Sequence, residues 1–338
     1  MSPAPCPYNH LFAGGERRCE LAQEGIADRP SSETGRSAGG KIGIMFEGFE
    51  LRSVTLEDEV CVRFRVGGAG PAVVLLHGHP RTHTTWHKVA PRLVTGGLTV
   101  VCPDLRGYGQ SSAPQPRDDH AQASKRAMAQ DVVGLMHQLG HDRFAVVGHD
   151  RGSYVAYRLA LDHPDRVTNL VVLDSVPIGE ALARADARFA QAWWHWFFLA
   201  QPETPERIIN ADPDAWYGVG ADLQAQMGND NYADYLAAIH DPNVVRAMIE
   251  DYRAGLGPDR AADAADRDAG HTISCPTTVA WSTFDDMETL YGDPLQVWRP
   301  WTTTLAGRRI NSGHHMAEQA PTEVADLLLE ALSQPADR

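Results

Sequence analysis

The stretch that decides the fold reads VVGHDRGSYVA and runs from Val146 to Ala156. Apolar residues lead into a turn with a glycine two positions before and two positions after Asp150, and apolar positions at helical spacing follow. The glycines at 148 and 152 indicate a sharp strand-to-helix turn in which the backbone closely approaches neighbouring elements. We therefore expect the turn to present the carboxyl group of Asp150 at the end of a buried strand.

A carboxylate at this turn favours a particular chemistry. With an ordinary pKa near ~3.9, Asp150 is ionised at neutral pH, whereas a serine in its place would need a base to become a nucleophile. A carboxylate can displace a leaving group from a saturated carbon and form an alkyl ester, which activated water then hydrolyses. Alkyl halides, haloacids and epoxides suit this route better than ordinary esters. The alternative is a solvated aspartate in a tight turn.

Length and composition exclude several classes of protein. A chain of 338 residues with 43% hydrophobic and 22% charged residues can bury a large globular core. The net charge of −14 argues against nucleic acid as a partner. We find no run of about 18 apolar residues that could cross a membrane and no signal-peptide core, so we expect a cytoplasmic protein. Five scattered cysteines predict neither disulfides nor a zinc site. We expect no cofactor and no metal, and a homodimer is an assembly that globular enzymes commonly adopt.

The pattern of the chain predicts its domains. Residues 1–44 show no sustained period and indicate a disordered extension, and residues 333–338 a frayed tail. Strands alternate with helices over 45–177 and 273–332, which predicts a mostly parallel sheet with helices on both faces. Residues 178–272 have helical runs, several aromatic residues and no buried-strand pattern. We interpret this segment as a helical cap inserted into the core.

Individual elements follow from the hydrophobic period. Two antiparallel edge strands are expected within residues 49–66, where apolar and polar residues alternate. The remaining strands are expected at 71–76, 98–102, 144–147, 167–173, 276–282 and 303–305, and helices at 124–139 and 321–332.

Candidate catalytic residues follow the buried strands. Ligands of parallel α/β sheets bind at the carboxyl ends of the strands, where Asp150, Asp174 and His314 are expected. His314 could act as a general base if a carboxylate holds its other ring nitrogen. Asp174 is the first choice for that carboxylate, and Asp285 or Asp286, after the next strand, is the alternative.

Other residues at these strand ends could stabilise an oxyanion. The backbone N–H groups of Arg151 and His79 are placed to do so. The segment His77-Gly78-His79-Pro80 could instead hold a metal, but its spacing is weak and no third ligand is evident. The Arg151 guanidinium could bind a substrate carboxylate through two hydrogen bonds, or it could form a salt bridge with a nearby acid.

The predicted cap contains the run WWHWFF at 193–198, most of which we expect to be packing residues. A leaving anion needs buried donors without a competing charge, such as indole, imidazole or phenol groups. His195, Trp196 and Tyr252 could supply them.

These motifs together resemble the fluoroacetate (haloacetate) dehalogenases of the α/β-hydrolase superfamily over about residues 45–330. The resemblance is carried by HGHP at 77–80, DLRGYGQSS at 104–112, GHDRG at 148–152, LALDHPDRV at 159–167, LDSVP at 173–177, WHWFF at 194–198, DYRAG at 251–255 and GHH at 313–315. It implies an α/β-hydrolase fold with a mostly parallel central sheet, helices on both faces and an inserted helical cap.

The resemblance also implies roles for the candidate residues. These are Asp150 as nucleophile, Asp174 as acid, His314 as base, His195, Trp196 and Tyr252 as halide donors, and Arg151 as the carboxylate clamp. The family typically carries a second Arg three residues after the first, where this chain has Tyr154. Tyr154 can donate one hydrogen bond but adds no charge, and losing a charge-assisted hydrogen bond costs about 1.5–3 kcal/mol.

The sequence therefore predicts a hydrolase that uses water to break a carbon–halogen bond in a small organohalide or haloacid. An epoxide hydrolase with the same machinery is the first alternative. It would need a phenol to protonate the ring oxygen, and four tyrosines of the predicted cap are candidates: Tyr217, Tyr232, Tyr235 and Tyr252. A catalytically silent binding protein on the same fold is the second alternative.

Overall fold

The computed structural model describes residues 45–57 and 59–333. The extension predicted for 1–44, and all of the predicted tail except Ser333, lie outside the described residues. No helix in the described part of the chain is both long and apolar enough to cross a membrane.

Eight strands form one sheet in the order β1-β2-β4-β3-β5-β6-β7-β8. The strands are β1 (Glu50–Thr55), β2 (Cys61–Gly67), β3 (Ala72–Leu76), β4 (Thr99–Pro103), β5 (Phe144–His149), β6 (Val167–Leu173), β7 (Thr277–Ser282) and β8 (Leu305–Ile310). β1 pairs antiparallel with β2 and β2 with β4, whereas β3 to β8 pair in parallel. The predicted α/β class, the mostly parallel sheet and the antiparallel strands at its edge are confirmed.

The prediction for the last strand was wrong in position. The strand lies at Leu305–Ile310 rather than at 303–305. Because β8 is an edge strand with mostly exposed or half-buried residues, it lacks the continuous apolar run that marks the buried strands.

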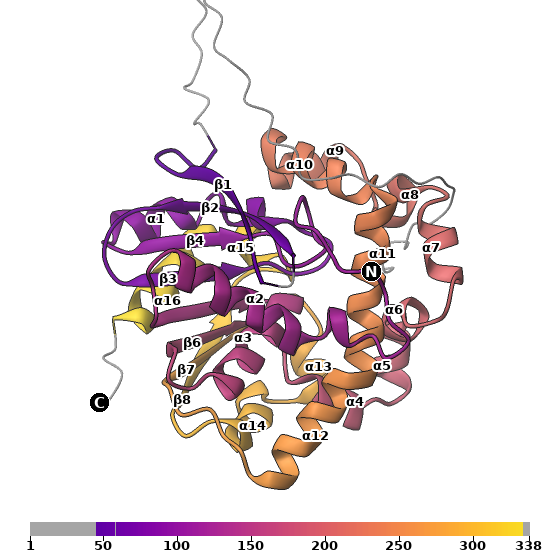
Figure 1. Cartoon of the computed structure of the whole chain (residues 1–338). Coiled ribbons are helices and arrows are strands. Elements are labelled where there is room, and N and C mark those ends of the chain that lie inside the picture. Colours follow the sequence, from indigo (N-terminus) through magenta and orange to yellow (C-terminus); the bar gives the residue numbers. More distant parts are fainter. Residues whose placement is uncertain (1–44, 58, 334–338) are drawn as a thin grey trace, which may run out of the picture.

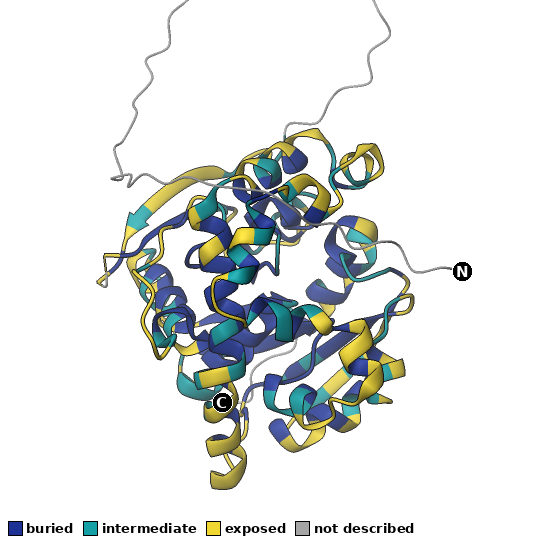
Figure 2. Cartoon of the chain, turned by 90° about the vertical axis from the view of Figure 1, so that its right-hand side faces the viewer, coloured by how far each residue is buried: buried dark blue, intermediate teal, exposed yellow. Residues whose placement is uncertain are grey.

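Helices cover both faces of the sheet, and alternate residues of a strand face opposite layers. Val74 and Leu76 of β3 belong to an apolar cluster that includes residues of α2 (Lys125–Gln138) and α3 (Arg151–Asp162). Val73 and Leu75 belong to a second cluster with residues of α1 (Ala90–Thr95) and α16 (Pro321–Leu332). The two-residue period of a strand thus gives each face its own apolar core. Figure 2 shows this buried centre surrounded by exposed outer helix surfaces.

The helices of the two covering layers include two that were predicted, at 124–139 and 321–332, and both are confirmed. The helices of these layers are α1 (Ala90–Thr95), α2 (Lys125–Gln138), α3 (Arg151–Asp162), α13 (Met287–Tyr291), α14 (Pro294–Trp298), α15 (Met316–Gln319) and α16 (Pro321–Leu332).

Nine further α-helices of the described chain lie between β6 and β7, with a short π-helix, Gly255–Asp259, between the last two, and we call the nine the inserted helices. They are α4 (Ile178–Ala183), α5 (Ala187–Ala192), α6 (Trp194–Leu199), α7 (Thr204–Ile209), α8 (Pro213–Tyr217), α9 (Ala221–Met227), α10 (Asn229–Ile239), α11 (Pro242–Ala254) and α12 (Arg260–Ala269). Figure 1 shows them in red to orange, along one side of the sheet. They flank the strand ends that carry the candidate site.

Candidate active site

Asp150 lies in the turn that joins β5 to α3, with φ at 50° and ψ at −120°. Non-glycine residues rarely adopt a positive φ, so this turn is strained. A Cβ atom on Gly148 would lie 2.3 Å from the carbonyl oxygen of Gly152, and one on Gly152 would lie 2.4 Å from that of Leu76. The two flanking glycines are therefore required by close packing of the backbone.

The loop after β3 approaches the same side chain. A Cβ atom on Gly78 would lie 2.4 Å from the Cβ of Asp150, so only glycine fits there. The backbone N–H of His79 donates a hydrogen bond to Asp150 Oδ1 at 2.7 Å. Arg151 is the first residue of α3, where backbone N–H groups have no partner within the helix. The structure thus places one of the two predicted oxyanion donors on the Asp150 carboxylate and the other at the start of the helix.

His314 comes from the loop after β8 and lies between carboxylates. Its Nε2 is 3.7 Å from Asp150 Oδ2. Its Nδ1 is 2.8 Å from Asp174 Oδ2 and 3.1 Å from Asp285 Oδ2. The structure brings together the three residues predicted as nucleophile, base and acid, and it also brings the alternative acid Asp285 to the same ring nitrogen.

The two acids beside His314 differ in how they are held. Asp174 follows β6, is 1% exposed, and accepts hydrogen bonds from the backbone N and the Oγ of Ser282 at 2.9 and 2.7 Å. The side chain of Asp285 is 29% exposed. Asp286 accepts a hydrogen bond from Trp193 Nε1 at 2.7 Å. Asp174 is thus the more deeply buried of the two acids, and both the backbone and the side chain of Ser282 hold it.

Electrostatics favour an ionised Asp150 and a protonated His314. Burial raises the pKa of Asp150, but the interaction with His314 and the charges of His314, His149 and Arg151 outweigh it and leave the pKa well below its ordinary value. Burial lowers the pKa of His314, but Asp150, Asp174 and Asp285 outweigh it and hold the pKa well above its ordinary value. In the resting site Asp150 is therefore a carboxylate paired with an imidazolium.

The salt bridge considered for Arg151 is present. Its Nε and Nη2 donate to the carboxylate of Asp251 at 2.9 and 3.0 Å, and Nη2 also donates to the Asp251 carbonyl at 2.7 Å. Asp251 in turn accepts hydrogen bonds from Tyr108 and from the buried ammonium of Lys125. Arg151 Nη1 has no hydrogen-bond partner among the described residues. One donor of this buried cation is thus left for a ligand.

Aromatic residues surround the Arg151 guanidinium beside Asp150. Its central carbon lies 4.1 Å from the ring centroid of Tyr252, 5.3 Å from that of Tyr154 and 5.7 Å from that of Trp196. These distances are in the range of cation–π contacts. Tyr154 therefore packs with Trp196 and Tyr252, which were predicted as halide donors, in one group.

The third predicted halide donor, His195, lies next to this group. Its ring centroid is 5.9 Å from that of Tyr252. Burial, partly opposed by the charge of Asp150, lowers the pKa of His195 to about 4. The ring is thus neutral near pH 7 and keeps one N–H to donate.

The other predicted phenols are distributed differently. Tyr232 and Tyr235 of α10 belong to a separate apolar cluster around Met227. The ring of Tyr217 is 5.8 Å from that of His79, compared with 5.2 Å for the ring of Tyr252. Tyr252 is thus the predicted phenol that contacts both the loop after β3 and Arg151.

The sequence interpretation did not include three residues that support the site. The Nε2 of His149 lies 2.7 Å from the His314 carbonyl oxygen, and Ser282 donates to Asp174. Asp251 holds Arg151. His149 and Asp251 directly precede predicted site residues, which is a signal that could have found them. Ser282 precedes the acidic pair after β7 but gives no chemical signal of its own.

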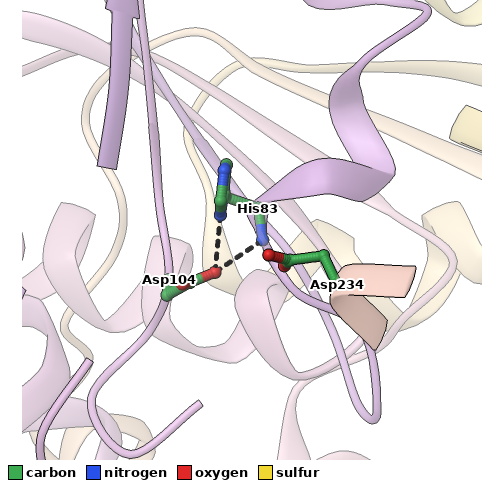
Figure 3. A group of neighbouring side chains, drawn as sticks. All are labelled: His83, Asp104 and Asp234. Atoms are coloured by element: carbon green, nitrogen blue, oxygen red, sulfur yellow. Dashed lines mark hydrogen bonds and ion pairs between the residues drawn. The ribbon is translucent and has the colours of Figure 1, made fainter. Parts of the chain in front are cut away.

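Two groups of side chains in the described chain have the composition of a metal site. One is Asp174, Asp285 and His314, whose donor atoms already face one another in the hydrogen bonds described above. The other joins His83 and Asp104 of the core to Asp234 of α10 (Figure 3).

In this second group the guanidinium of Arg63 supplies the positive charge beside the two carboxylates. Its Nη1 lies 2.8 Å from Asp234 Oδ1 and 3.4 Å from Asp104 Oδ2. Asp104 Oδ1 also accepts a hydrogen bond from the His83 backbone at 2.8 Å. The group fits a charged junction between core and inserted helices better than a metal site. Of the two histidines considered as metal ligands, His77 has both ring nitrogens in hydrogen bonds with Leu105 N and Gly78 O, and His79 belongs to neither of the two groups found among the described residues.

Comparison with known proteins agrees with this architecture. A model of the α/β hydrolase fold family matches residues 71–292. A fluoroacetate dehalogenase from Burkholderia sp is 41% identical over 295 residues, which cover 86% of this chain and 95% of that protein. A soluble epoxide hydrolase from Corynebacterium sp. (strain C12) is 29% identical over 303 residues, which cover 85% of this chain and 94% of that protein.

Solved structures show the same fold. The crystal structure of ALR0039 from Nostoc sp PCC 7120 superposes with a TM-score of 0.81 at 40% identity, over 86% of this chain and all of that one. The epoxide hydrolase CorEH gives a TM-score of 0.75 at 27% identity, over 84% of this chain and 99% of that one. The fold defines the class as the α/β-hydrolase superfamily, and within it the chain belongs to the family of fluoroacetate and haloacetate dehalogenases.

Proposed function

We propose that the protein hydrolyses a carbon–halogen bond in a small haloacid or related organohalide, with water as co-substrate and no cofactor. In the first step an oxygen of Asp150 forms a bond to the halogen-bearing carbon, and the halide leaves with the bonding electrons. The observation that carries the proposal is the alignment of Asp150, His314 and Asp174, with 3.7 Å from Asp150 to Nε2 and 2.8 Å from Nδ1 to Asp174. The 41% identity to a fluoroacetate dehalogenase supports the same reaction.

We assign recognition of the substrate to the residues around Arg151. His195, Trp196 and Tyr252 would donate hydrogen bonds to the departing halide because all three are neutral donors, of which Trp196 and Tyr252 are buried and His195 is half-buried. Arg151 Nη1 would donate to a substrate carboxylate, and Tyr154 would add at most one uncharged hydrogen bond.

The second step hydrolyses the ester on Asp150. Esterification removes the negative charge of Asp150, which is one of the causes that raise the pKa of His314, so His314 can lose its proton. Neutral His314 then takes a proton from water while the water oxygen attacks the carboxyl carbon of Asp150. The oxyanion that forms is placed to accept hydrogen bonds from the backbone N–H groups of His79 and Arg151. Its collapse breaks the bond between the carboxyl carbon of Asp150 and the alkoxide oxygen, which takes up the proton that His314 removed from water, and releases the alcohol.

The same proposal covers the organisation of the chain. Residues 45–177 and 273–332 would form the catalytic core, and residues 178–272 the cap that closes over it. A cytoplasmic location and a homodimer also belong to this proposal, and cell fractionation and light scattering test them.

Epoxide hydrolysis is the second candidate function. Relatives include epoxide hydrolases. Burial and the neighbouring Asp150 raise the pKa of the Tyr252 phenol well above its ordinary value, so this residue stays protonated and could donate to a ring oxygen.

One experiment separates these candidates. The protein is incubated with chloro-, bromo- and fluoroacetate while halide release is measured, and with styrene oxide while diol is measured. Asp150→Asn serves as the control for background hydrolysis. Halide release that depends on Asp150 supports the proposal, and diol without halide supports the epoxide hydrolase. Release of neither product, also from a wider organohalide panel, contradicts both and favours a binding protein.

A further inference from the structure

A cavity of about 410 Å³ lies between the core and the inserted helices. The core contributes the loop after β3 and the region of α15, and the inserted helices contribute α6, α8, α9 and α10. Its walls include His79, His195, Leu199, Trp216, Tyr217 and Leu223. Cavities of roughly 300–1,000 Å³ are typical of sites for drug-sized ligands. This cavity is therefore much larger than a two-carbon acid needs.

The cavity borders the proposed reaction centre. His79, in its wall, donates its backbone N–H to Asp150 at 2.7 Å. His195, proposed above as a halide donor, is also in the wall, as is His315, the neighbour of His314. A substrate whose carbon reaches Asp150 would thus have the cavity beside its remaining atoms.

The walls carry no uncompensated charge among the described residues that line the cavity. Burial lowers the pKa of His79 to about 3 and that of His195 to about 4, and it holds the pKa of His315 well below its ordinary value. Arg81 is the charged side chain in the wall, and Glu318 pairs with it through hydrogen bonds of 3.0 and 3.2 Å. The guanidinium of Arg81 also lies 5.0 Å from the ring centroid of Tyr235. A charged group would find no free counter-charge here. Apart from the amides of Gln226 and Gln319, the uncharged side chains of the wall are aromatic, imidazole or aliphatic groups, which suit an apolar substituent.

We propose that this cavity binds an uncharged apolar substituent of about the size of a phenyl ring, attached to the carbon that Asp150 attacks. The substrate class is then the α-halogenated acids with an aryl or branched alkyl group, and the products are the corresponding α-hydroxy acids. This inference rests on the proposed function, because it names the substrates of the same site.

The first test compares chloride release from chloroacetate and from the two enantiomers of 2-chloro-2-phenylacetate. Burying a phenyl ring should raise kcat/KM for at least one enantiomer about tenfold to hundredfold over chloroacetate. A kcat/KM for both enantiomers equal to or below that of chloroacetate overturns the proposal.

A cavity-filling variant makes the test specific. Leu223 of α9 lines the cavity and is half-buried, so Leu223→Trp should occupy the space intended for the substituent. The ratio of kcat/KM for the phenyl substrate to that for chloroacetate should fall at least tenfold. Ala225→Trp on the same helix is exposed and does not line the cavity, so it should leave that ratio unchanged. A ratio that moves equally in both variants, or in neither, overturns the proposal.

Binding without reaction separates this proposal from the proposed function. Phenylacetate and acetate have no leaving group, and Trp216 in the wall provides a fluorescence signal. We expect phenylacetate to bind at least tenfold more tightly than acetate, and Leu223→Trp to remove the difference. If this holds while no organohalide is turned over, the cavity assignment stands and the dehalogenase function fails. Equal binding of the two ligands overturns the cavity assignment whatever the turnover.

Discussion

The two halves of the candidate site are built in different ways. In the core half, Asp150, Asp174 and His314 follow β5, β6 and β8, and backbone groups such as His79 N and Ser282 N hold the carboxylates. In the half that faces the inserted helices, aromatic rings pack around Arg151, and Asp251 of α11 holds the guanidinium through hydrogen bonds. Hydrogen bonds from backbone donors are directional and orient the carboxylates, whereas ring contacts depend less on direction.

The difference suggests a division of labour. Bond formation and cleavage need reacting atoms at about 3–3.5 Å in a fixed direction, which suits the core half. Recognition of a leaving group or substituent depends on shape and neutral donors, which suits the inserted helices. Changes in the core half should therefore mainly lower kcat, and changes in the other half should mainly alter the choice of substrate.

The largest effect should come from the nucleophile. Asp150→Asn keeps the size of the side chain but removes the carboxylate, so we expect halide release to fall by at least about 10⁴-fold. Intact-protein mass spectrometry must accompany the assay, because deamidation would restore the acid. Activity above a tenth of wild type in undeamidated protein would contradict the role of Asp150 as the nucleophile.

The acid should matter less than the nucleophile because a second carboxylate is close. Asp174→Asn leaves Asp285 at 3.1 Å from Nδ1, and we expect kcat to fall about 10²–10³-fold. Asp285→Asn leaves the buried and doubly hydrogen-bonded Asp174 in place, and the loss should stay below about tenfold. The two kcat values from steady-state halide release decide the order, and a reversed order would make Asp285 the acid.

A smaller effect is expected from the opposite half. Tyr252→Phe removes a phenol donor but keeps the ring 4.1 Å from the Arg151 guanidinium. Losing one hydrogen bond to a developing anion should cost about 1.5–3 kcal/mol, or roughly tenfold to hundredfold in kcat/KM. The rate of fluoride release should fall more than the rate of bromide release, because fluoride is the poorer leaving group and depends more on hydrogen-bond donors. Equal losses for both would argue against a role of Tyr252 in halide departure.

The smallest expected effect is a shift in the pH dependence of ester hydrolysis. His314 must be neutral to activate water, and its pKa is raised by Asp150, Asp174 and Asp285 against the effect of burial. The rate of ester hydrolysis should therefore rise with pH. Asp285→Asn removes one negative charge, lowers the pKa of His314 and should move this rise to lower pH. Decay of the ester, followed by quenched flow and mass spectrometry, measures it, and an unchanged or upward-shifted profile would contradict the assignment.

The fold was largely predictable because its decisive elements are local in sequence. Buried strands such as β3 and β5 are continuous apolar runs, and the turn around Asp150 carries its own glycines. The bounds of β8 were missed because an exposed edge strand has no apolar signature. The long interval between β6 and β7 showed as a loss of strand pattern, but the bounds of its nine described helices did not follow from it.

The site was predictable as a set of residues but not as a network. Order along the chain indicated Asp150, Asp174 and His314, because strand ends meet at one edge. The sequence could not show that Asp285 reaches the same nitrogen as Asp174. The two residues follow neighbouring strands, β6 and β7, and only the structure shows that both side chains reach His314. The sequence likewise could not show that Asp251 neutralises Arg151, because their contact spans 100 residues of chain.

The central claim is that the carboxylate of Asp150 attacks a saturated carbon. His314→Asn removes the base of the second step, so an ester formed in the first step should accumulate. Intact-protein and peptide mass spectrometry after incubation with bromoacetate should find the added mass of the carboxymethyl group on the peptide that contains Asp150. Wild type that turns the substrate over, combined with a His314→Asn variant that never carries this mass, would contradict the account.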